Sequence, residues 1–243
     1  MSRNELIMVL EVCCYNLHSA LIAQEAGAHR VELCADPGDG GTTPSYSLIK
    51  TARKKLNIAL YPIIRTRGGD FLFSDEEFDV MLHDVIACKK IGCDGVVIGI
   101  LQTDGTVDKS KCRQLVEAAY PLGVTFHRAF DWAINPFEAL EDIIDIGCER
   151  ILTSGQQPTA IQGAPLIADL VKQSADRIII MPGSGIRASN IADVAKDTGA
   201  TEFHSSARIN IKTSMAYLNA AMQEEQVTVM ADRHEIENML KQI

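Results

Sequence analysis

A short apolar run followed by an amphipathic helical stretch recurs eight times along the 243 residues, and this alternation restricts the fold most strongly. The apolar runs cover residues 7–13, 29–34, 58–65, 95–100, 124–127, 149–153, 177–181 and 202–205. Short runs that are apolar almost throughout are typical of parallel strands buried on both faces. Because a parallel strand needs a long crossover before the next one, usually a helix, the pattern predicts an α/β fold.

The helical stretches between these runs complete the expected architecture. They cover residues 17–26, 45–56, 74–91, 108–119, 135–146, 159–174, 189–196 and 214–223, and a further amphipathic helix is expected at 232–242. Eight strand–helix pairs in this length predict a (β/α)8 TIM barrel with an extra C-terminal helix, as one domain over residues 1–243. An open doubly wound sheet is the alternative, but no dinucleotide-binding glycine fingerprint follows the first run.

Composition excludes several classes of function. The formal net charge of −9 opposes a nucleic-acid role, which needs a basic face. No apolar run reaches the roughly 18 residues of a membrane helix, and residues 1–5 lack the layout of a signal peptide. The seven cysteines are odd in number and lack CxxC spacing, which favours neither a disulfide framework nor a zinc ribbon. We therefore expect a cytoplasmic protein that binds neither nucleic acid nor membranes.

The first two predicted strands end in the same pair of groups. Glu11 and Cys13 close the first, and Glu32 and Cys34 close the second. Residues two apart in a strand share a face, so parallel neighbours would gather two carboxylates and two thiols in one volume. Two thiolates suit the soft ion Cu(I), although buried free cysteine also serves simply as a small hydrophobe. Cys14 should face the opposite way within a regular strand.

Charged and hydroxyl side chains follow the ends of other predicted strands, where barrel enzymes place their active sites. This rim contains Glu11, Glu32, Arg65, His127, Arg128, Asp131, Thr153, Ser154 and His204. If the protein is an enzyme, Glu11 or Glu32 could act as general base, with a pKa raised by the neighbouring carboxylate. His127 could be the partner acid, and Arg65 and Arg128 could hold an anionic substrate. Any one of these residues could instead be a satisfied buried group or a rim ion pair.

A glycine-rich loop follows the seventh predicted strand. Gly183, Ser184 and Gly185 stand between that strand and the next helix, where backbone N–H groups can approach an anion closely. Many barrels bind phosphate at the loops after strands seven and eight, and Ser205 follows strand eight. The loop predicts an anion site; the alternative is a tight turn that simply requires glycine.

Taken together, these motifs resemble the CutC family of copper homeostasis proteins. The residues that support the resemblance lie at 10–13, 27–34, 40–45, 62–71, 125–131, 151–155, 181–186 and 202–204. The resemblance implies a barrel fold, a cytoplasmic location, copper handling and a homodimer or homotetramer. It also implies that Cys13 and Cys34 are the Cu(I) ligands.

Three hypotheses about function follow. The first is a Cu(I)-binding homeostasis protein that uses the two cysteines. The rim is richer than a two-thiol site requires, so the second is a barrel enzyme with acid–base chemistry on a small phosphorylated or otherwise anionic metabolite, in which Glu11, Glu32, Arg65, His127 and Asp131 act. The third, a purely structural interaction protein, gives the charged rim no purpose.

Overall fold

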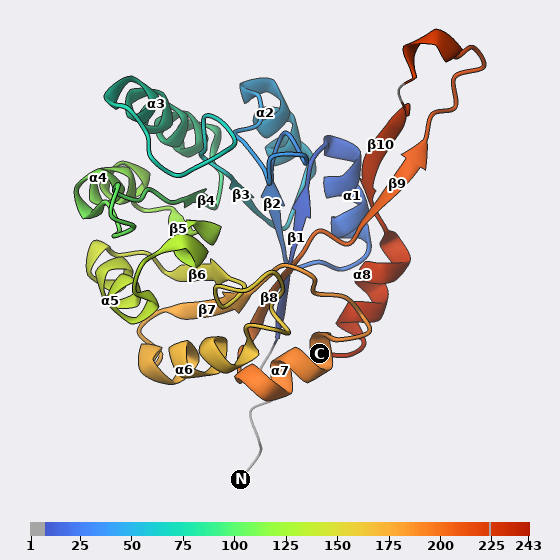
Figure 1. The fold of residues 1–243 in the computed structure, drawn as a ribbon. Coiled ribbons are helices and arrows are strands. Elements are labelled where there is room, and N and C mark those ends of the chain that lie inside the picture. Colours follow the sequence, from blue (N-terminus) through green and yellow to red (C-terminus); the bar gives the residue numbers. More distant parts are fainter. Residues whose placement is uncertain (1–7, 224) are drawn as a thin grey trace.

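The computed structural model describes residues 8–223 and 225–243, in which eight parallel strands form a ring with helices outside it (Figure 1). The strands are β1 Val9–Cys14, β2 Arg30–Leu33, β3 Ala59–Pro62, β4 Gly95–Ile98, β5 Gly123–Phe126, β6 Arg150–Thr153, β7 Ile179–Pro182 and β8 Glu202–Ser205. They pair in the orders β3-β2-β1-β8 and β4-β5-β6-β7. A parallel bridge from Ile63 to Val97 joins the two sets on one side, and β7 lies against β8 on the other. The predicted TIM barrel is confirmed; Ile7, the expected start of the first strand, lies outside the described residues.

Helices follow the strands in the expected order. They are α1 Leu17–Glu25, α2 Tyr46–Lys55, α3 Asp75–Ile91, α4 Lys109–Ala119, α5 Pro136–Ile146, α6 Ala164–Ser174, α7 Ile191–Thr198 and α8 Arg233–Leu240, with short 3-10 turns η1 Arg128–Trp132 and η2 Ala220–Met222. The longest, α3, begins with a capping box in which Ser74 and Glu77 satisfy each other's backbone N–H groups. The helix expected from residue 159 begins five residues later, because residues 159–163 form turns.

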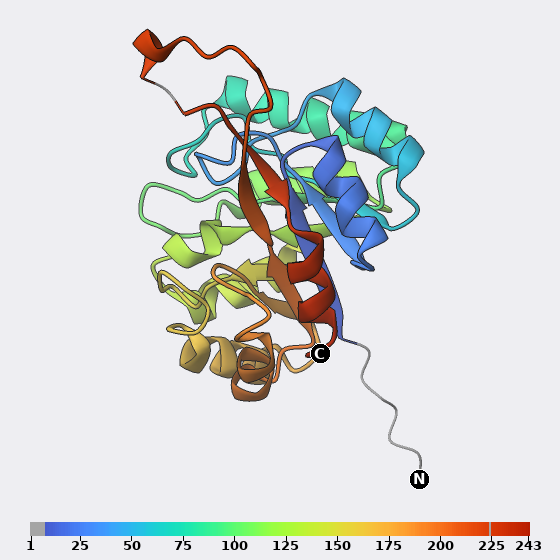
Figure 2. The same cartoon turned by 90° about the vertical axis from the view of Figure 1, so that its right-hand side faces the viewer.

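The C-terminal region differs from the sequence prediction. The helix predicted at residues 214–223 is wrong: a hairpin of β9 Arg208–Lys212 and β10 Val227–Ala231 projects beyond the barrel there (Figures 1 and 2). An isolated helix of this length is marginal without a surface to pack on, and residues 214–223, which connect the two strands, are exposed in this chain. The predicted terminal helix is confirmed as α8, which packs against α1 and serves as the eighth barrel helix instead of adding a ninth.

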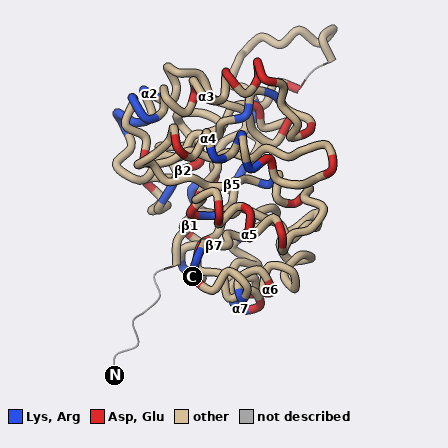
Figure 3. Tube along the Cα trace, turned by 90° about the vertical axis from the view of Figure 1, so that its left-hand side faces the viewer, with Lys and Arg blue, Asp and Glu red and all other residues tan. Residues whose placement is uncertain are grey.

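Both basic and acidic residues occur on the side of the molecule drawn in Figure 3. No helix among residues 8–223 and 225–243 has the length and apolar character needed to cross a membrane.

Candidate functional site

A cleft of about 940 Å³ opens among the loops that follow the strands. The residues that line it come from loops on both sides of the barrel and include Cys13, Tyr15, Glu32, Asp39, Arg65, Asp70, Phe71, His127, Arg128, Trp132, Ser184, Gly185, Ile186, Arg187, His204, Ser205, Ser206 and Arg208. Most of the rim predicted from the sequence therefore faces one common space.

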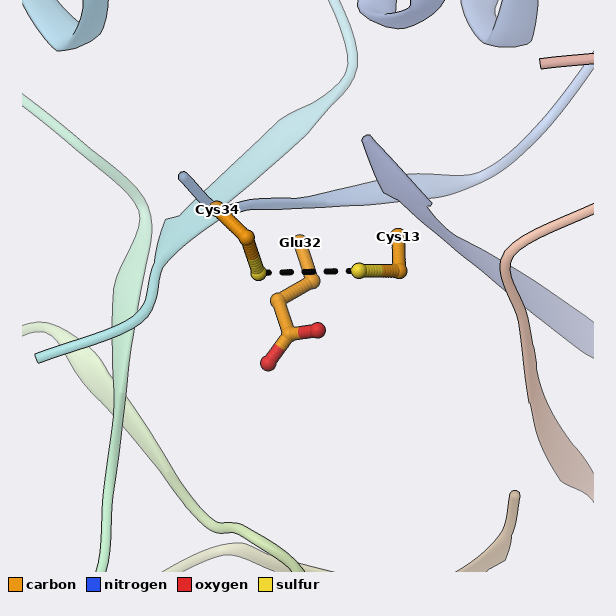
Figure 4. A group of neighbouring side chains, drawn as sticks. All are labelled: Cys13, Glu32 and Cys34. Atoms are coloured by element: carbon orange, nitrogen blue, oxygen red, sulfur yellow. Dashed lines mark hydrogen bonds between the residues drawn. The ribbon is translucent and has the colours of Figure 1, made fainter. Parts of the chain in front are cut away.

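Cys13 lines this cleft, and its thiol points toward that of Cys34 (Figure 4). Parallel pairing of β1 with β2 sets Cys13 beside Glu32, and Cys34 follows directly after β2. The Sγ atoms of Cys13 and Cys34 lie 3.5 Å apart, and a carboxylate oxygen of Glu32 lies within 4.8 Å of both. Three of the four groups expected together from the i, i+2 spacing therefore meet, while Glu11 lies opposite Arg30 in the register and does not join them. Cys14 is buried and its Sγ bonds to the Val12 carbonyl oxygen, away from the pair.

The pKa values of the two thiols shift in opposite directions. A hydrogen bond from Cys34 lowers the pKa of Cys13 well below its usual range despite burial, and His204 lowers it further. Burial, followed by the bond to Cys13 and its negative charge, raises the pKa of Cys34. The arrangement thus favours one thiolate next to one thiol, which is the reactive and metal-binding form of cysteine.

The two glutamates at the strand ends behave differently. Burial raises the pKa of Glu32, and the negative charge of Cys13 raises it further. Burial also opposes ionisation of Glu11, but Arg30 and His204 outweigh it and lower its pKa to about 2. The expected upward shift is therefore wrong for Glu11. The pKa of Glu32 is raised, but by burial and Cys13 ahead of the neighbouring carboxylate from which the sequence predicted the shift.

His204 links these groups. Its Nδ1 lies 2.7 Å from Glu11 Oε1, and its Nε2 lies 3.8 Å from Glu32 Oε2. Burial lowers the pKa of His204, but hydrogen bonding to Cys13 and Glu11 raises it well above its usual value. The imidazolium favours the charged forms of Glu11 and Cys13, whereas burial and the charge of Cys13 keep the pKa of Glu32 raised despite it.

Below the thiols, the barrel interior contains an ionic layer that sequence reasoning missed. Arg30 binds Glu11 and lies 2.6 Å from Glu202, and Arg150 binds both oxygens of Glu202 at 2.6 and 3.2 Å. All four side chains are less than one-tenth exposed. The signal was present in the sequence, because Arg30 precedes Glu32 by two residues and so shares its face.

Arg65 holds two loops over the cleft. Its Nη1 donates to the carbonyls of Asp39 and Gly41, at 2.7 and 3.1 Å, and its Nη2 donates to that of Gly69 at 2.7 Å. The first of these loops covers Cys34, since a Cβ on Gly41 would lie 3.2 Å from the sulfur. Three of its five N–H groups therefore hold the loops, while Arg65 Nε has no hydrogen-bond partner among the described residues. The role of Arg65 in holding an anionic substrate stays a prediction.

His127 lies at the end of β5 and is 3% exposed. Its Nδ1 accepts the N–H of Ala129 at 3.1 Å. Burial and the charge of Arg65 lower the pKa of His127 to about 3. A histidine this hard to protonate is poorly suited to donate a proton as a general acid near neutral pH, so the expected role of partner acid is not favoured.

Asp131 and Arg128 form a structural unit next to β6. Asp131 accepts hydrogen bonds from the Thr153 hydroxyl at 2.5 Å, from Ser154 and from Arg128, and its side chain is 4% exposed. Arg128 also donates to the Ser154 hydroxyl at 2.9 Å. These bonds orient the turn η1, and they leave Asp131 little capacity to act as a base.

The predicted anion loop is built only in part. Ser184 and Gly185 line the cleft with positive φ values of 74° and 78°. Gly183 instead donates its N–H to Thr153, and the hydroxyl of Ser205 donates to the Ile186 carbonyl at 2.8 Å. Of the residues proposed from the sequence, Arg128, Ser184, Gly185 and Ser205 line the cleft, but the hydroxyls of both serines are already bonded, that of Ser184 to the Pro158 carbonyl at 2.8 Å.

Comparison with known proteins connects this site to a family. The family model described as CutC family matches residues 8–209, which include both cysteines, Glu32 and His204. The chain belongs to the CutC family. It is 54% identical over 209 residues to family protein CutC of Chromobacterium violaceum, covering 86% of this chain and 85% of the relative. Family protein CutC of Parabacteroides distasonis is 48% identical over 236 residues, or 94% and 97% of the two chains.

Solved structures agree on the fold. The crystal structure of the CutC protein from Streptococcus agalactiae, which is provisionally named a copper homeostasis protein, aligns with a TM-score of 0.79 at 32% identity over 82% of this chain and 98% of that one. An aldolase, QR15, aligns at 0.61 with 15% identity over 85% and 93% of the two chains. At so low an identity, the aldolase indicates only a shared barrel.

Proposed function

We propose that this protein binds Cu(I) through Cys13 and Cys34 and serves in copper homeostasis. The observation that supports this most directly is the 3.5 Å separation of the two buried Sγ atoms. Thiolates lie about 2.3 Å from a bound Zn²⁺, so two sulfurs that share an ion of similar size can be at most about 4.6 Å apart. The pair therefore fits one ion without backbone movement.

The chemistry of the donors favours a soft ion. Two thiolates select Cu(I), whereas the oxygen of Glu32 is a harder ligand that suits other metals better. One cysteine is already poised to ionise, so binding needs the loss of only one further proton. Free thiols of this kind remain reduced in the cytoplasm, which is where we place the function. The copper-homeostasis designation of the Streptococcus agalactiae relative points the same way.

An anaerobic Cu(I) titration against a competing chelator tests the proposal. We expect Cys13→Ser and Cys34→Ser each to weaken binding by more than about 100-fold, because each removes a direct ligand. Cys112→Ser is the matched control, since Cys112 is equally buried but lies in α4. Glu32→Gln should change Cu(I) affinity little. Equal binding by the wild type and the cysteine variants, or Zn²⁺ binding that is tighter and depends on Glu32, would contradict the proposal.

A second function is favoured by the cleft itself, which is far larger than an ion needs. An enzyme acting on a small phosphorylated or anionic metabolite would use Glu32 as its acid–base group, next to His204, while Glu11, Arg65, His127 and Asp131 hold the site together. A turnover screen against such metabolites tests this. Glu32→Gln should abolish any activity found and leave Cu(I) affinity unchanged; activity that depends on the cysteines and not on Glu32 would argue against it.

We also propose that the chain forms a homo-oligomer through the β9–β10 hairpin. Large apolar side chains stand exposed on it, namely Ile209, Ile211, Met215, Tyr217, Leu218, Met222 and Val227. A concentrated apolar set on one projection is typical of a protein interface, and a second copy would bring the same surface. Light scattering should show a dimer or tetramer for the wild type and a smaller species for Tyr217→Ser/Leu218→Ser. A wild-type monomer would contradict this.

A further inference from the structure

We propose that the cleft contains a second ligand site, separate from the thiol pair, in which His127 Nε2–H and Arg65 Nε–H bind an oxyanion of a small organic ligand. The oxyanion is a carboxylate or a phosphate group. This site is independent of copper binding, and it identifies the end of the cleft that would recognise the anion of a metabolite.

The hydrogen bonding of His127 determines which ring nitrogen carries the proton. Ala129 donates its backbone N–H to Nδ1, so Nδ1 is the acceptor and the proton of the neutral ring is on Nε2. Because burial and Arg65 lower the pKa of His127 to about 3, the ring stays neutral at physiological pH. His127 therefore offers a permanent N–H donor at Nε2.

Within residues 8–223 and 225–243, this donor has no hydrogen-bond partner. Among the described residues, His127 Nε2 and Arg65 Nε are buried nitrogens without a hydrogen-bond partner, although both side chains border the cleft. Buried donors are nearly always satisfied, because leaving one unpaired forfeits its hydration. A pair of them at one cleft indicates that the missing acceptor comes from a bound molecule.

The ring is held rigidly in this position. A Cβ on Gly99 would lie 2.4 Å from His127 Cε1, so only glycine leaves room for the ring on that side. Phe71 packs against it with ring centroids 5.1 Å apart, and the Arg65 guanidinium lies 4.9 Å from the centre of the Phe71 ring. The two donors are thus fixed before any ligand arrives, which reduces the entropy lost on binding.

Charge identifies the class of ligand. Four arginines line the cleft, Arg65, Arg128, Arg187 and Arg208, against three carboxylates, Glu32, Asp39 and Asp70, although the whole chain has a net charge of −9. A local excess of positive charge in a concave site attracts anions. Since the unpartnered ring nitrogen of His127 carries a proton and not a lone pair, an oxygen acceptor fits it and a metal ion does not.

Nuclear magnetic resonance of ¹⁵N-histidine-labelled full-length protein tests the inference on the wild type first. At pH 7 we expect His127 to be neutral with its proton on Nε2. Titration with inorganic phosphate in one arm and acetate in the other should shift this Nε2–H signal saturably in at least one arm, and the arm that responds identifies the group. A protonated ring, a proton on Nδ1, or no saturable shift in either arm would overturn the proposal.

Variants then separate this site from the thiols. His127→Phe keeps an aromatic ring but removes the donor, and should weaken anion binding at least tenfold while leaving Cu(I) affinity within twofold. His127→Gln, which restores an N–H donor, should recover part of the loss, and His83→Phe in exposed α3 surface serves as the control. Anion binding that survives His127→Phe unchanged overturns the inference. Loss of Cu(I) binding in Cys13→Ser/Cys34→Ser, with anion binding retained, keeps the two sites distinguishable.

Discussion

Two polar layers lie within the same barrel, and their hydrogen bonding differs. The inner layer of Glu11, Arg30, Arg150 and Glu202 joins two acids to two bases, and each of its side chains bonds to at least one of the others. The outer layer, nearer the cleft, contains the thiol pair, Glu32 and the incompletely bonded His127 and Arg65. A buried charged group whose hydrogen bonds are made within the protein stabilises the local geometry. A buried polar group at a cleft that lacks a partner instead indicates a bound ligand.

This contrast explains why charge alone was a poor guide to the site. Asp131 was a candidate catalytic residue from its place after β5, yet its carboxylate already accepts hydrogen bonds from Thr153 of β6 and from Ser154. His204, by contrast, is central because it joins Glu11 of the inner layer to Glu32 of the outer one. The number of hydrogen-bond partners within the protein, and not the residue type, therefore distinguishes a structural residue from a residue of the functional site.

The largest effect should come from breaking the inner layer. Arg150→Ala would leave Glu202 short of a partner and Glu149 without its 2.8 Å contact, and should lower the free energy of unfolding by about 3 to 5 kcal/mol. Urea denaturation measures this. Arg177→Ala, which breaks the exposed pair with Glu141, is the control and should change stability little. A small effect of Arg150→Ala would mean that the inner layer is not structurally important.

The next largest effect should be on the pH dependence of stability, because His127 of the outer layer and Glu11 of the inner layer protonate in different pH ranges. His127 stays neutral in the folded protein down to about pH 3, whereas an unfolded histidine protonates below about 6.5, so stability should fall as pH drops from 6.5 toward 3. Glu11 has a folded pKa of about 2, so its contribution is fully present above 4.5 and is lost only below that.

Between pH 6.5 and 4.5, the free energy of unfolding should therefore fall by about 2 to 3 kcal/mol less in His127→Phe than in the wild type, since one pH unit corresponds to about 1.36 kcal/mol. Denaturant midpoints measured across this range check it. Below pH 4.5 the variant should still lose stability, because Glu11 is intact. An unchanged slope above pH 4.5 would show that His127 titrates normally and is not buried as a neutral ring.

The smallest stability effect should come from the outer thiols. Cys34→Ser exchanges one small buried group for another that can still bond to Cys13, and should cost about 1 kcal/mol. Thermal unfolding with and without bound Cu(I) measures this. Copper should raise the melting temperature of the wild type and not of the variant. A loss as large as that of Arg150→Ala would place the thiols in the structural layer.

The sequence by itself determined the barrel and the meeting of Cys13, Glu32 and Cys34. Both follow from local periodicity: two-residue alternation assigns each side chain a face, and helical crossovers make neighbouring strands parallel. Only the tertiary structure decided which charges were already satisfied and which were free. The bond from His204 to Glu11 spans 193 residues, and that from Arg150 to Glu202 spans 52, so no local spacing could reveal them. Tertiary structure also decided the fate of the helix predicted at residues 214–223. A helix of that length forms only where its apolar face packs against a core, and this segment instead connects the two strands of the hairpin.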